Sequence, residues 1–305
     1  DETGAVQEIV EDKDTTKQQQ QIKEINTGIC CFDSDLLWSA VDNLDTDNAQ
    51  GEYYLTDVIG ILSNADHLVA GITANSPQET IGVNTRLHLA EAEKILRTRT
   101  CEQHMASGVT IIDPTNTYID STVEIEQDTV IYPGTFIEGQ TKIASDVVIG
   151  PQSRIIDSTI GAGVEIENST IKNSKIEAGT VVGPYAYLRP GTKVGQNAKV
   201  GDFVEIKKST VGAGAKVPHL SYIGDTEIGE NTNIGAGTIT ANYDGENKHQ
   251  TQIADNCFIG SNSTLIAPLK LAKGAVTGAG AVVTKDVKEN EVVIGVPAKP
   301  KDENK

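Results

Sequence analysis

The sequence predicts a mainly β protein: a left-handed parallel β-helix of about ten coils, preceded by a partial α/β segment and a linker helix. Three observations favour this architecture. Aliphatic residues recur at a stride of five or six over most of the chain. Glycine is abundant, with 29 residues, whereas aromatic residues make up only 4%, which suits aliphatic packing and tight turns. A polar insertion interrupts the repeat at about residues 240–252.

Residues 1–84 predict an α/β fragment, in which strand-like and helix-like patterns alternate. The expected strands are 8–11, 22–31 and 67–72, and the expected helices are 36–44 and 53–64. Residues 85–106 combine apolar positions with dispersed charge and predict a linker helix of roughly 30 Å at about 1.5 Å per residue. The chain starts at Asp1 in a strand-like segment without an initiator Met, so we expect a partial chain.

Residues 107–298 carry the repeat that predicts the β-helix. Neither the period of a helix nor that of a strand turns one residue in six inward so persistently. Short strands joined by tight turns into a triangular coil do, and coils stacked about 4.8 Å apart pair their backbone amides. The expected inward positions include Ile119, Ile125, Ile131, Ile137, Ile143, Ile149, Ile155, Ile171, Leu188, Ile206, Ile223, Ile234, Ile253, Ile259, Leu265, Leu271 and Val283. We expect residues 299–305 to form a solvated tail.

Composition argues against several classes of partner. The net charge of −18 disfavours nucleic acid and anionic membranes. No apolar run approaches the about 20 residues that span a bilayer, and no secretory signal opens the chain. Cys30, Cys31, Cys101 and Cys257 lack the paired spacing of a zinc site. We expect them to be reduced and mostly buried, in a cytoplasmic protein.

The fold class does not by itself select a function, because β-helices of this kind include acyltransferases, zinc carbonic anhydrases and non-catalytic scaffolds. Residues 182–250 contain as many basic as acidic residues, so this window is neutral while the whole chain carries −18. Such a window suits an anionic substrate. Arg189 and Lys207 each follow an inward residue at the same phase of the repeat, which predicts a clamp for a phosphate one coil apart.

His219 and the segment 233–248 are the other candidates. A lone histidine is usually structural, but its intrinsic pKa suits removal of a proton from an attacking amine. Gly235, Ala236 and Gly237 permit close approach of a pantetheine arm, and Asn242 offers an amide to orient a base or to stabilise an oxyanion. A turn followed by a bare loop remains an alternative interpretation of this segment.

Two other functions are compatible with a β-helix of this kind. A carbonic anhydrase needs three zinc-binding histidines, whereas the coil offers only His219 and His249. A non-catalytic hexapeptide-repeat scaffold or regulatory coil explains the repeat but not the clustered polar residues, and substitution of His219 tests it.

Several segments stand in a familiar order: NAQGEYYLTD (48–57), GVNTR (82–86), LRPGT (188–192), GDFVEIKKS (201–209), HLSYIGD (219–225) and NIGAGTITANYDGENK (233–248). Over nearly the whole chain the sequence resembles the bacterial bifunctional N-acetylglucosamine-1-phosphate uridyltransferase/glucosamine-1-phosphate N-acetyltransferase family. The resemblance implies transfer of acetyl from acetyl-CoA to the amine of glucosamine 1-phosphate, in UDP-N-acetylglucosamine biosynthesis for cell-wall precursors. It also implies a homotrimer with active sites between subunits, and it implies that residues 1–84 are the C-terminal remnant of a Rossmann-like α/β uridyltransferase domain.

By this resemblance, His219 is the general base, and Asn242 orients it or the substrate. The amine attacks the thioester directly, without an acyl-enzyme. The residues that hold the sugar phosphate are Arg189, Lys207, Tyr222, Asn233 and Lys248. Those that line the acetyl-CoA groove are Ala236, Asn242, Tyr243, Ser261 and Ala279.

The chain departs from the family in two places. The Gly-rich nucleotide loop and a magnesium-binding Asp are missing, and Glu11, Asn26 and Asn84 remain of the uridyltransferase site, the last as a Mg²⁺ ligand in the full-length parent. We therefore expect no uridyltransferase activity here. The family's arginine near the end of the coil is also missing, and Lys299 or Lys301 would replace it only as a point charge, which puts CoA affinity in doubt.

Overall fold

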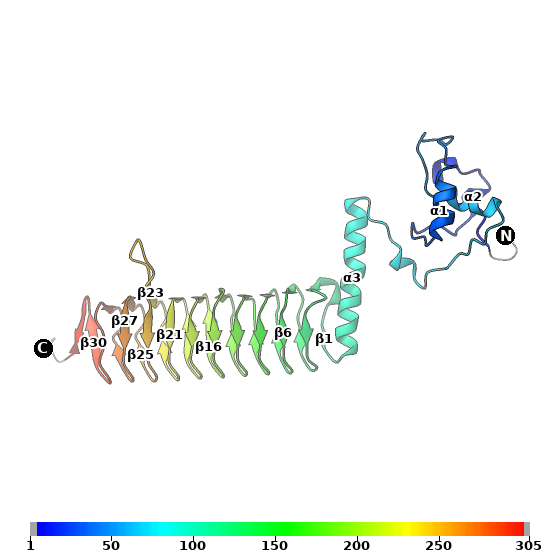
Figure 1. The fold of residues 1–305 in the computed structure, drawn as a ribbon. Helices are drawn as coiled ribbons and strands as arrows, with labels where there is room; N and C mark the ends of the chain where they lie inside the picture. The colour runs from blue at the N-terminus through cyan, green and yellow to red at the C-terminus, as the bar shows by residue number, and fades with distance from the viewer. Residues whose placement is uncertain (1–4, 302–305) are drawn as a thin grey trace. The chain divides into compact units, whose positions relative to one another are not determined.

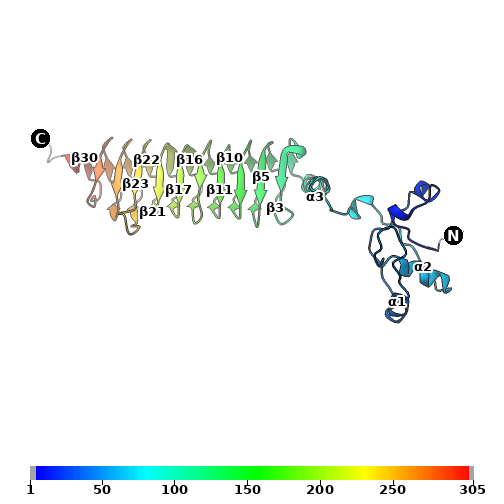
Figure 2. The same ribbon diagram turned by 90° about the horizontal axis from the view of Figure 1, so that it is seen from above.

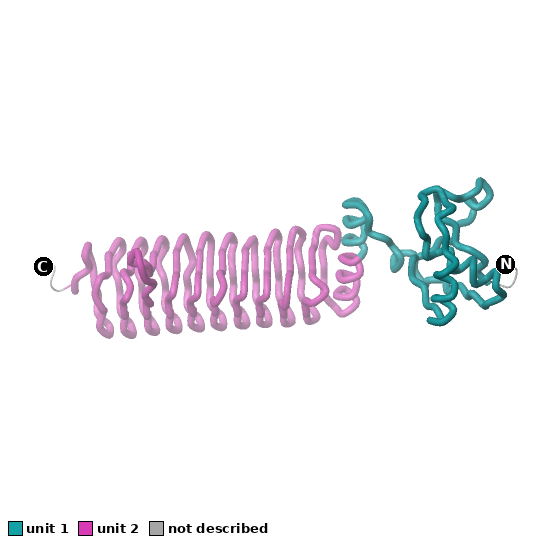
Figure 3. Tube along the Cα trace, turned by 45° about the horizontal axis from the view of Figure 1, so that its top comes forward, with its two compact units in different colours: residues 1–95 teal, residues 96–305 magenta. Residues whose placement is uncertain are grey.

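The structure, a computed structural model, describes residues 5–301. Figures 1 and 2 show its helices and strands from two directions. The chain divides into two compact units, residues 1–95 and 96–305, which Figure 3 distinguishes by colour. Each unit is described by itself below.

The first unit contains two α-helices, α1 (Ser34–Val41) and α2 (Asp57–Asn64). The Asp33 side chain accepts hydrogen bonds from two backbone amides at the start of α1 and so caps that helix. Ala40, Val58 and Leu62 form the buried centre of a small apolar cluster between the helices. Both helices overlap the segments where the sequence predicts helices. Three short 3₁₀ helices complete the unit: η1 (Asp12–Asp14), η2 (Gln19–Gln21) and η3 (Pro77–Glu79).

The prediction of three strands at 8–11, 22–31 and 67–72 is wrong. Among residues 5–84 the only β pairing is an isolated antiparallel bridge between Ala5 and Ala70, so no Rossmann-like sheet forms here. A strand persists only where a neighbour pairs its amides and covers its apolar side chains. Ile29 and Ile72 have no such cover and are 81% and 96% exposed. Cys30 and Cys31 are exposed for the same reason, contrary to expectation, whereas Cys101 and Cys257 are buried.

The helix α3 (Arg86–Ala106) lies where the sequence predicts a linker helix. The boundary between the two units falls inside it, after residue 95, rather than at its ends. Its second half packs on the first coil, because Cys101 is fully buried in the core of the β-helix. The Arg97 guanidinium lies 4.4 Å from the centre of the Tyr118 ring and donates a hydrogen bond of 3.2 Å to the Thr115 carbonyl.

The β-helix consists of three parallel sheets, to which the coils contribute strands in turn. Sheet I contains β1 (Thr110–Ile111), β4 (Val130–Ile131), β7 (Val148–Ile149), β10 (Glu165–Ile166), β13 (Val181–Val182), β16 (Lys199–Asp202), β19 (Lys216–His219), β22 (Asn233–Ile234), β25 (Phe258–Ile259), β28 (Val276–Thr277), β30 (Val292–Gly295) and β31 (Ala298–Pro300). Sheet II contains β2 (Thr117–Ile119), β5 (Thr135–Glu138), β8 (Arg154–Ile156), β11 (Thr170–Lys172), β14 (Tyr187–Leu188), β17 (Glu205–Lys207), β20 (Tyr222–Gly224), β23 (Ile239–Ala241), β26 (Thr264–Ile266) and β29 (Val282–Val283). Sheet III contains β3 (Glu124–Ile125), β6 (Lys142–Ile143), β9 (Thr159–Ile160), β12 (Lys175–Ile176), β15 (Lys193–Val194), β18 (Thr210–Val211), β21 (Thr226–Ile228), β24 (Thr251–Ile253) and β27 (Leu269–Leu271). A 3₁₀ helix, η4 (Pro114–Asn116), precedes β2.

The core of this unit is a column of side chains that are aliphatic in most strands, whereas β23 and β28 contribute the buried Thr240 and Thr277. On sheet II, Leu188, Ile206 and Ile223 stand in register on successive coils and are fully buried. The stride of five or six residues is therefore the side length of the triangular coil, and the predicted left-handed parallel β-helix of about ten coils is confirmed. The predicted break is confirmed as a loop that leaves the stack between β23 and β24 (Figure 1).

The end of the β-helix differs from the expected tail. The strand β31 pairs antiparallel with β30, and Ile294 stands opposite Lys299. Lys299 and Pro300 are thus part of a strand, because a hairpin at the end of sheet I satisfies their backbone groups. The rest of the expected tail, 302–305, lies outside the described residues. Over residues 5–301, no helix is both long enough and apolar enough to cross a bilayer.

Candidate active site

His219 ends β19, and the structure places a carboxylate directly beside it. Asp202 ends the neighbouring strand β16 and stands in register with His219. The His219 Nδ1 and Asp202 Oδ1 atoms lie 2.5 Å apart. The hydrogen bond from His219 lowers the pKa of Asp202, which therefore stays ionised near neutral pH.

This contact determines which nitrogen of His219 can act as a base. An ionised carboxylate only accepts hydrogen bonds, so Nδ1 carries the proton in the neutral ring. Nε2 then holds the lone pair, and it has no hydrogen-bond partner among the described residues. The His219 side chain is 52% exposed, so an amine can approach Nε2 from solvent. The geometry suits a general base.

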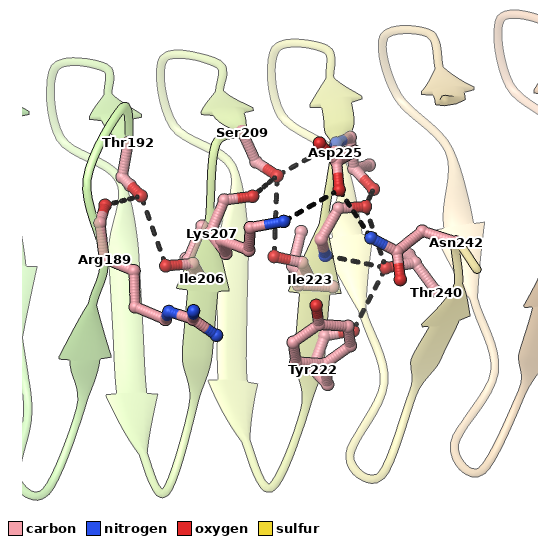
Figure 4. A network of polar contacts seen from close by, with 12 residues as sticks. Arg189, Thr192, Ile206, Lys207, Ser209, Tyr222, Ile223, Asp225, Thr240 and Asn242 are labelled. Carbon is pink, nitrogen blue, oxygen red and sulfur yellow. Dashed lines mark hydrogen bonds and ion pairs between the residues drawn. The ribbon is translucent and has the colours of Figure 1, made fainter. Parts of the chain in front are cut away.

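A second polar group surrounds Asp225, which follows β20 (Figure 4). The Asp225 Oδ2 atom accepts a hydrogen bond of 2.5 Å from the Asn242 amide and one of 3.3 Å from Lys207 Nζ. Asp225 and Lys207 are 14% and 17% exposed, and Asn242 is buried. One carboxylate thus fixes both a cation and an amide that the sequence predicts as site residues.

Arg189, Lys207 and Tyr222 come from successive strands of sheet II and lie on its outer face, as Figure 4 shows. The Arg189 Nη1 atom donates a 2.8 Å hydrogen bond to Glu205 Oε1, and this pair is more than one-third exposed on both sides. The predicted position of the two cations, one coil apart on the same face, is confirmed by the register of Leu188 opposite Ile206.

Lys248 reaches this face from the loop after β23. Its amine is within hydrogen-bonding reach of Lys207, and this contact lowers the pKa of Lys248. The pKa of Lys207 is raised by the same contact and by its hydrogen bond to Asp225. Lys207 therefore keeps its proton, whereas Lys248 gives its proton up more easily than an ordinary lysine.

The loop that carries Lys248 is an ordered hairpin rather than a bare loop. Tyr243 and Lys248 form an antiparallel bridge, and the Tyr243 hydroxyl donates to the Gly245 carbonyl. The Asp244 carboxylate accepts from the backbone amides of residues 246 and 247 at 2.8 and 2.7 Å, and it lies 2.6 Å from His249 Nε2. The backbone amide of Asn247 and the contact with His249 lower the pKa of Asp244.

The structure divides the predicted acetyl-CoA residues between two edges of sheet II. Ala236, Ser261 and Ala279 lie at the corner between sheets I and II on successive coils, where the Ala236 and Ser261 carbonyls accept from the backbone of the next coil at 2.7 and 2.8 Å. Asn242 and Tyr243 lie at the opposite edge, after β23. Asn233 lies in β22, opposite Lys216.

His219 and the Asp225 group likewise flank β20 from opposite ends. No hydrogen bond or ion pair joins the two groups within the part of the chain that the structure describes. A shallow groove of about 810 Å³ lies elsewhere, on sheet III beside Glu227, Gln252 and Lys270, and it contains none of the predicted site residues.

The predicted remnant of the uridyltransferase site is dispersed in the first unit. Glu11 accepts from the Thr56 hydroxyl, Asn26 accepts from the Gly28 amide, and Asn84 is exposed. No hydrogen bond joins these three residues, and residues 5–301 contain no cluster of three or more His, Cys, Asp or Glu side chains that could hold a metal ion. The described residues therefore do not fit a magnesium site.

Three carboxylates of the site were missed by the sequence prediction: Asp202, Glu205 and Asp225. Each pairs with a predicted residue 16 to 18 positions away in sequence. That separation is one turn of the coil, so a search for opposite charges one coil apart would have found them.

Comparison with known proteins agrees with this architecture. Two family models match the coil: bacterial transferase hexapeptide (six repeats) at residues 173–208, and hexapeptide repeat of succinyl-transferase at residues 250–285. Among solved structures, an Arabidopsis UDP-N-acetylglucosamine acyltransferase is similar over 60% of this chain and 73% of its own, at 17% identity and a TM-score of 0.39, which is too weak to inform function.

Curated relatives are much more similar. The chain is 51% identical over 293 residues to the bifunctional protein GlmU of Brevibacillus brevis. The matched region covers 96% of this chain and 64% of that protein. It is 49% identical over 305 residues to the bifunctional protein GlmU of Listeria innocua, covering 100% of this chain and 66% of that protein. The chain spans just under two thirds of the length of these relatives. It belongs to the GlmU family of bifunctional proteins.

Proposed function

We propose that this chain transfers acetyl from acetyl-CoA to the amine of glucosamine 1-phosphate, giving N-acetylglucosamine 1-phosphate in the cytoplasm. The observation that carries the proposal is the histidine–carboxylate pair: Asp202 holds His219 Nδ1 at 2.5 Å and leaves Nε2 open to solvent. A solvated β-helix used only as a scaffold has no need for such a pair. Membership of the GlmU family supports the same reaction.

The chemistry follows from the position of that lone pair. The sugar ammonium first loses one proton to water. The free amine then attacks the thioester carbonyl directly, while His219 Nε2 takes a second proton from the attacking nitrogen. A carbon–nitrogen bond forms, the carbon–sulfur bond breaks, and the proton held by His219 passes to the departing thiolate. No covalent acyl-enzyme is needed. Because Asp225 holds one N–H of Asn242, only the second N–H and Oδ1 of this amide remain to orient the substrate.

The cations of sheet II are the proposed phosphate site. Arg189 and Lys207 already have acidic partners, so a dianionic phosphate competes with Glu205 and Asp225 for them. The pKa of Lys248 is lowered beside Lys207, and an approaching phosphate would favour the charged form of Lys248. Tyr222 and Asn233 complete the proposed sugar site, and the corner formed by Ala236, Ser261 and Ala279 is the proposed path for acetyl-CoA.

We also propose that the active site is completed by neighbouring copies of the chain in a homotrimer. His219 and the Asp225 group lie at opposite ends of β20, a strand about 10 Å long at about 3.3 Å per residue. In such a trimer, a neighbouring copy can place its Asp225 group beside His219 of this chain.

The test is release of free thiol when the purified chain is mixed with acetyl-CoA and glucosamine 1-phosphate. His219→Ala should abolish it, and plain glucosamine should be a poor substrate because it lacks the phosphate. The matched control is His67→Ala, which removes an exposed histidine of the first unit and should leave the rate unchanged. Equal rates for the wild type and His219→Ala, or no release from a folded trimer, would favour a non-catalytic scaffold.

A further inference from the structure

We infer that Asp202 is a positioning residue: it holds His219 in the tautomer that exposes Nε2 and stabilises the imidazolium that forms when His219 takes the proton. This inference rests on the proposed function for its role in catalysis. It concerns a residue of β16 that contacts His219 rather than the substrate.

The backbone fixes the two side chains against each other. Asp202 and His219 are register partners in neighbouring parallel strands, and the Leu220 amide donates a 2.9 Å hydrogen bond to the Asp202 carbonyl. One residue earlier, Gly201 lies so close to β19 that a Cβ there would stand 1.9 Å from the Pro218 carbonyl oxygen. The backbone contacts between β16 and β19 therefore keep the Asp202 carboxylate beside the His219 imidazole.

The contact between Asp202 and His219 is electrostatic as well as steric. The carboxylate attracts the ring most strongly after the ring has taken a proton, so the pair stabilises the charged form. Lys199, on the strand of Asp202, is the other charged group that acts on this carboxylate. Lys216 lies opposite Lys199 on β19, and Asn233 on β22 is neutral. Asp202 is therefore the acidic partner of His219 among these neighbours.

The size of the effect is limited by solvent. The side chains of His219 and Asp202 are 52% and 34% exposed, so salt and water screen their attraction. At metal sites, loss of the partner that orients a histidine ligand typically costs about 10- to 100-fold in affinity or activity, and we use that range as the guide here. We expect the lower end here, about tenfold in kcat/KM, for Asp202→Asn.

The first readout is the pH profile of thiol release by the full chain. Asp202→Asn keeps the shape of the side chain but removes its charge, so the imidazolium loses stability. The acid limb of kcat/KM should then move to lower pH, and the plateau should fall. Asp202→Glu should restore part of the rate. The control is Asp255→Asn, at another corner of the coil, because among the described residues the Asp255 carboxylate accepts a hydrogen bond only from the backbone amide of residue 230.

The second readout does not need activity: NMR titration of isotope-labelled histidine in the full chain, with His219 assigned by His219→Ala. Asp202→Asn should lower the midpoint of His219 and leave the other histidines unchanged, in a protein with an unchanged thermal midpoint. A titration midpoint and an acid limb that both stay where they are would overturn the inference. If the wild type proves inactive, the proposed function fails, while the titration still decides whether Asp202 controls the proton on His219.

Discussion

The Asp225 carboxylate should be the polar group on which the stability of this part of the coil depends most. Asp225→Ala leaves the buried Asn242 amide and the largely buried Lys207 ammonium without their shared acceptor. A hydrogen bond from an amide to an ionised carboxylate contributes about 1.5–3 kcal/mol. The ion pair at 3.3 Å adds about 1 kcal/mol, because its groups are only 17% and 14% exposed. We expect a loss of about 3 kcal/mol in the free energy of unfolding.

The matched control lies one coil away. Glu205→Ala removes the acidic partner of Arg189, but that pair is 38% and 40% exposed, so the expected loss is below about 1 kcal/mol. Thermal unfolding of both variants at one protein concentration, followed by circular dichroism, measures the difference. For a unit of this size about 3 kcal/mol corresponds to a fall of roughly 6–12 °C in Tm. Equal shifts for Asp225→Ala and Glu205→Ala would refute the reasoning from burial.

Three further predictions concern the coil and its loop. Ile206→Ala, at a fully buried position, should cost about 2–5 kcal/mol in denaturant unfolding, whereas the outward-facing Thr210→Ala should cost less than about 0.5 kcal/mol. Gly201→Ala should push β19 away from β16 and lower both Tm and thiol release, because no side chain fits against the Pro218 carbonyl, and an unchanged Tm would count against this. The loop held by Asp244 should keep its order at pH 4, because the pKa of this carboxylate is lower in the folded chain than its unfolded value of about 3.9. The stabilisation from Asp244 is complete above the unfolded pKa and is lost only as pH falls through the lower folded pKa, which the Asn247 amide resonance should report.

The repeat could be predicted from sequence because the inward position of most strands is filled by an aliphatic side chain. Ile206 and Ile223 fill this position in register, and their neighbours in the sequence do not. The strands of the first unit could not be predicted in the same way. Apolar residues such as Ile29 and Ile72 indicate a strand only if a partner strand is present, and the described chain supplies none.

The site shows the same contrast at the level of single residues. His219 and Lys207 could be predicted from their chemical type and from the phase of the repeat. Their partners Asp202 and Asp225 could be found only by comparing residues one coil apart, because an aspartate at a turn of the coil is common and gains its role from a residue on the neighbouring coil. These contacts form because the two residues of each pair occupy the same position on neighbouring turns of the triangular coil.

The two ends of the β-helix have a consequence for assembly. Stacked coils present unpaired strand edges at both ends of each sheet, and such edges can recruit a further chain without limit. Here the second half of α3, with Cys101 buried, covers the first coil, and the antiparallel β31 turns back on β30 at the other end of sheet I. Both elements oppose end-to-end growth into a filament where they lie, at the first coil and at sheet I, and this favours contacts between copies along the sides of the stack.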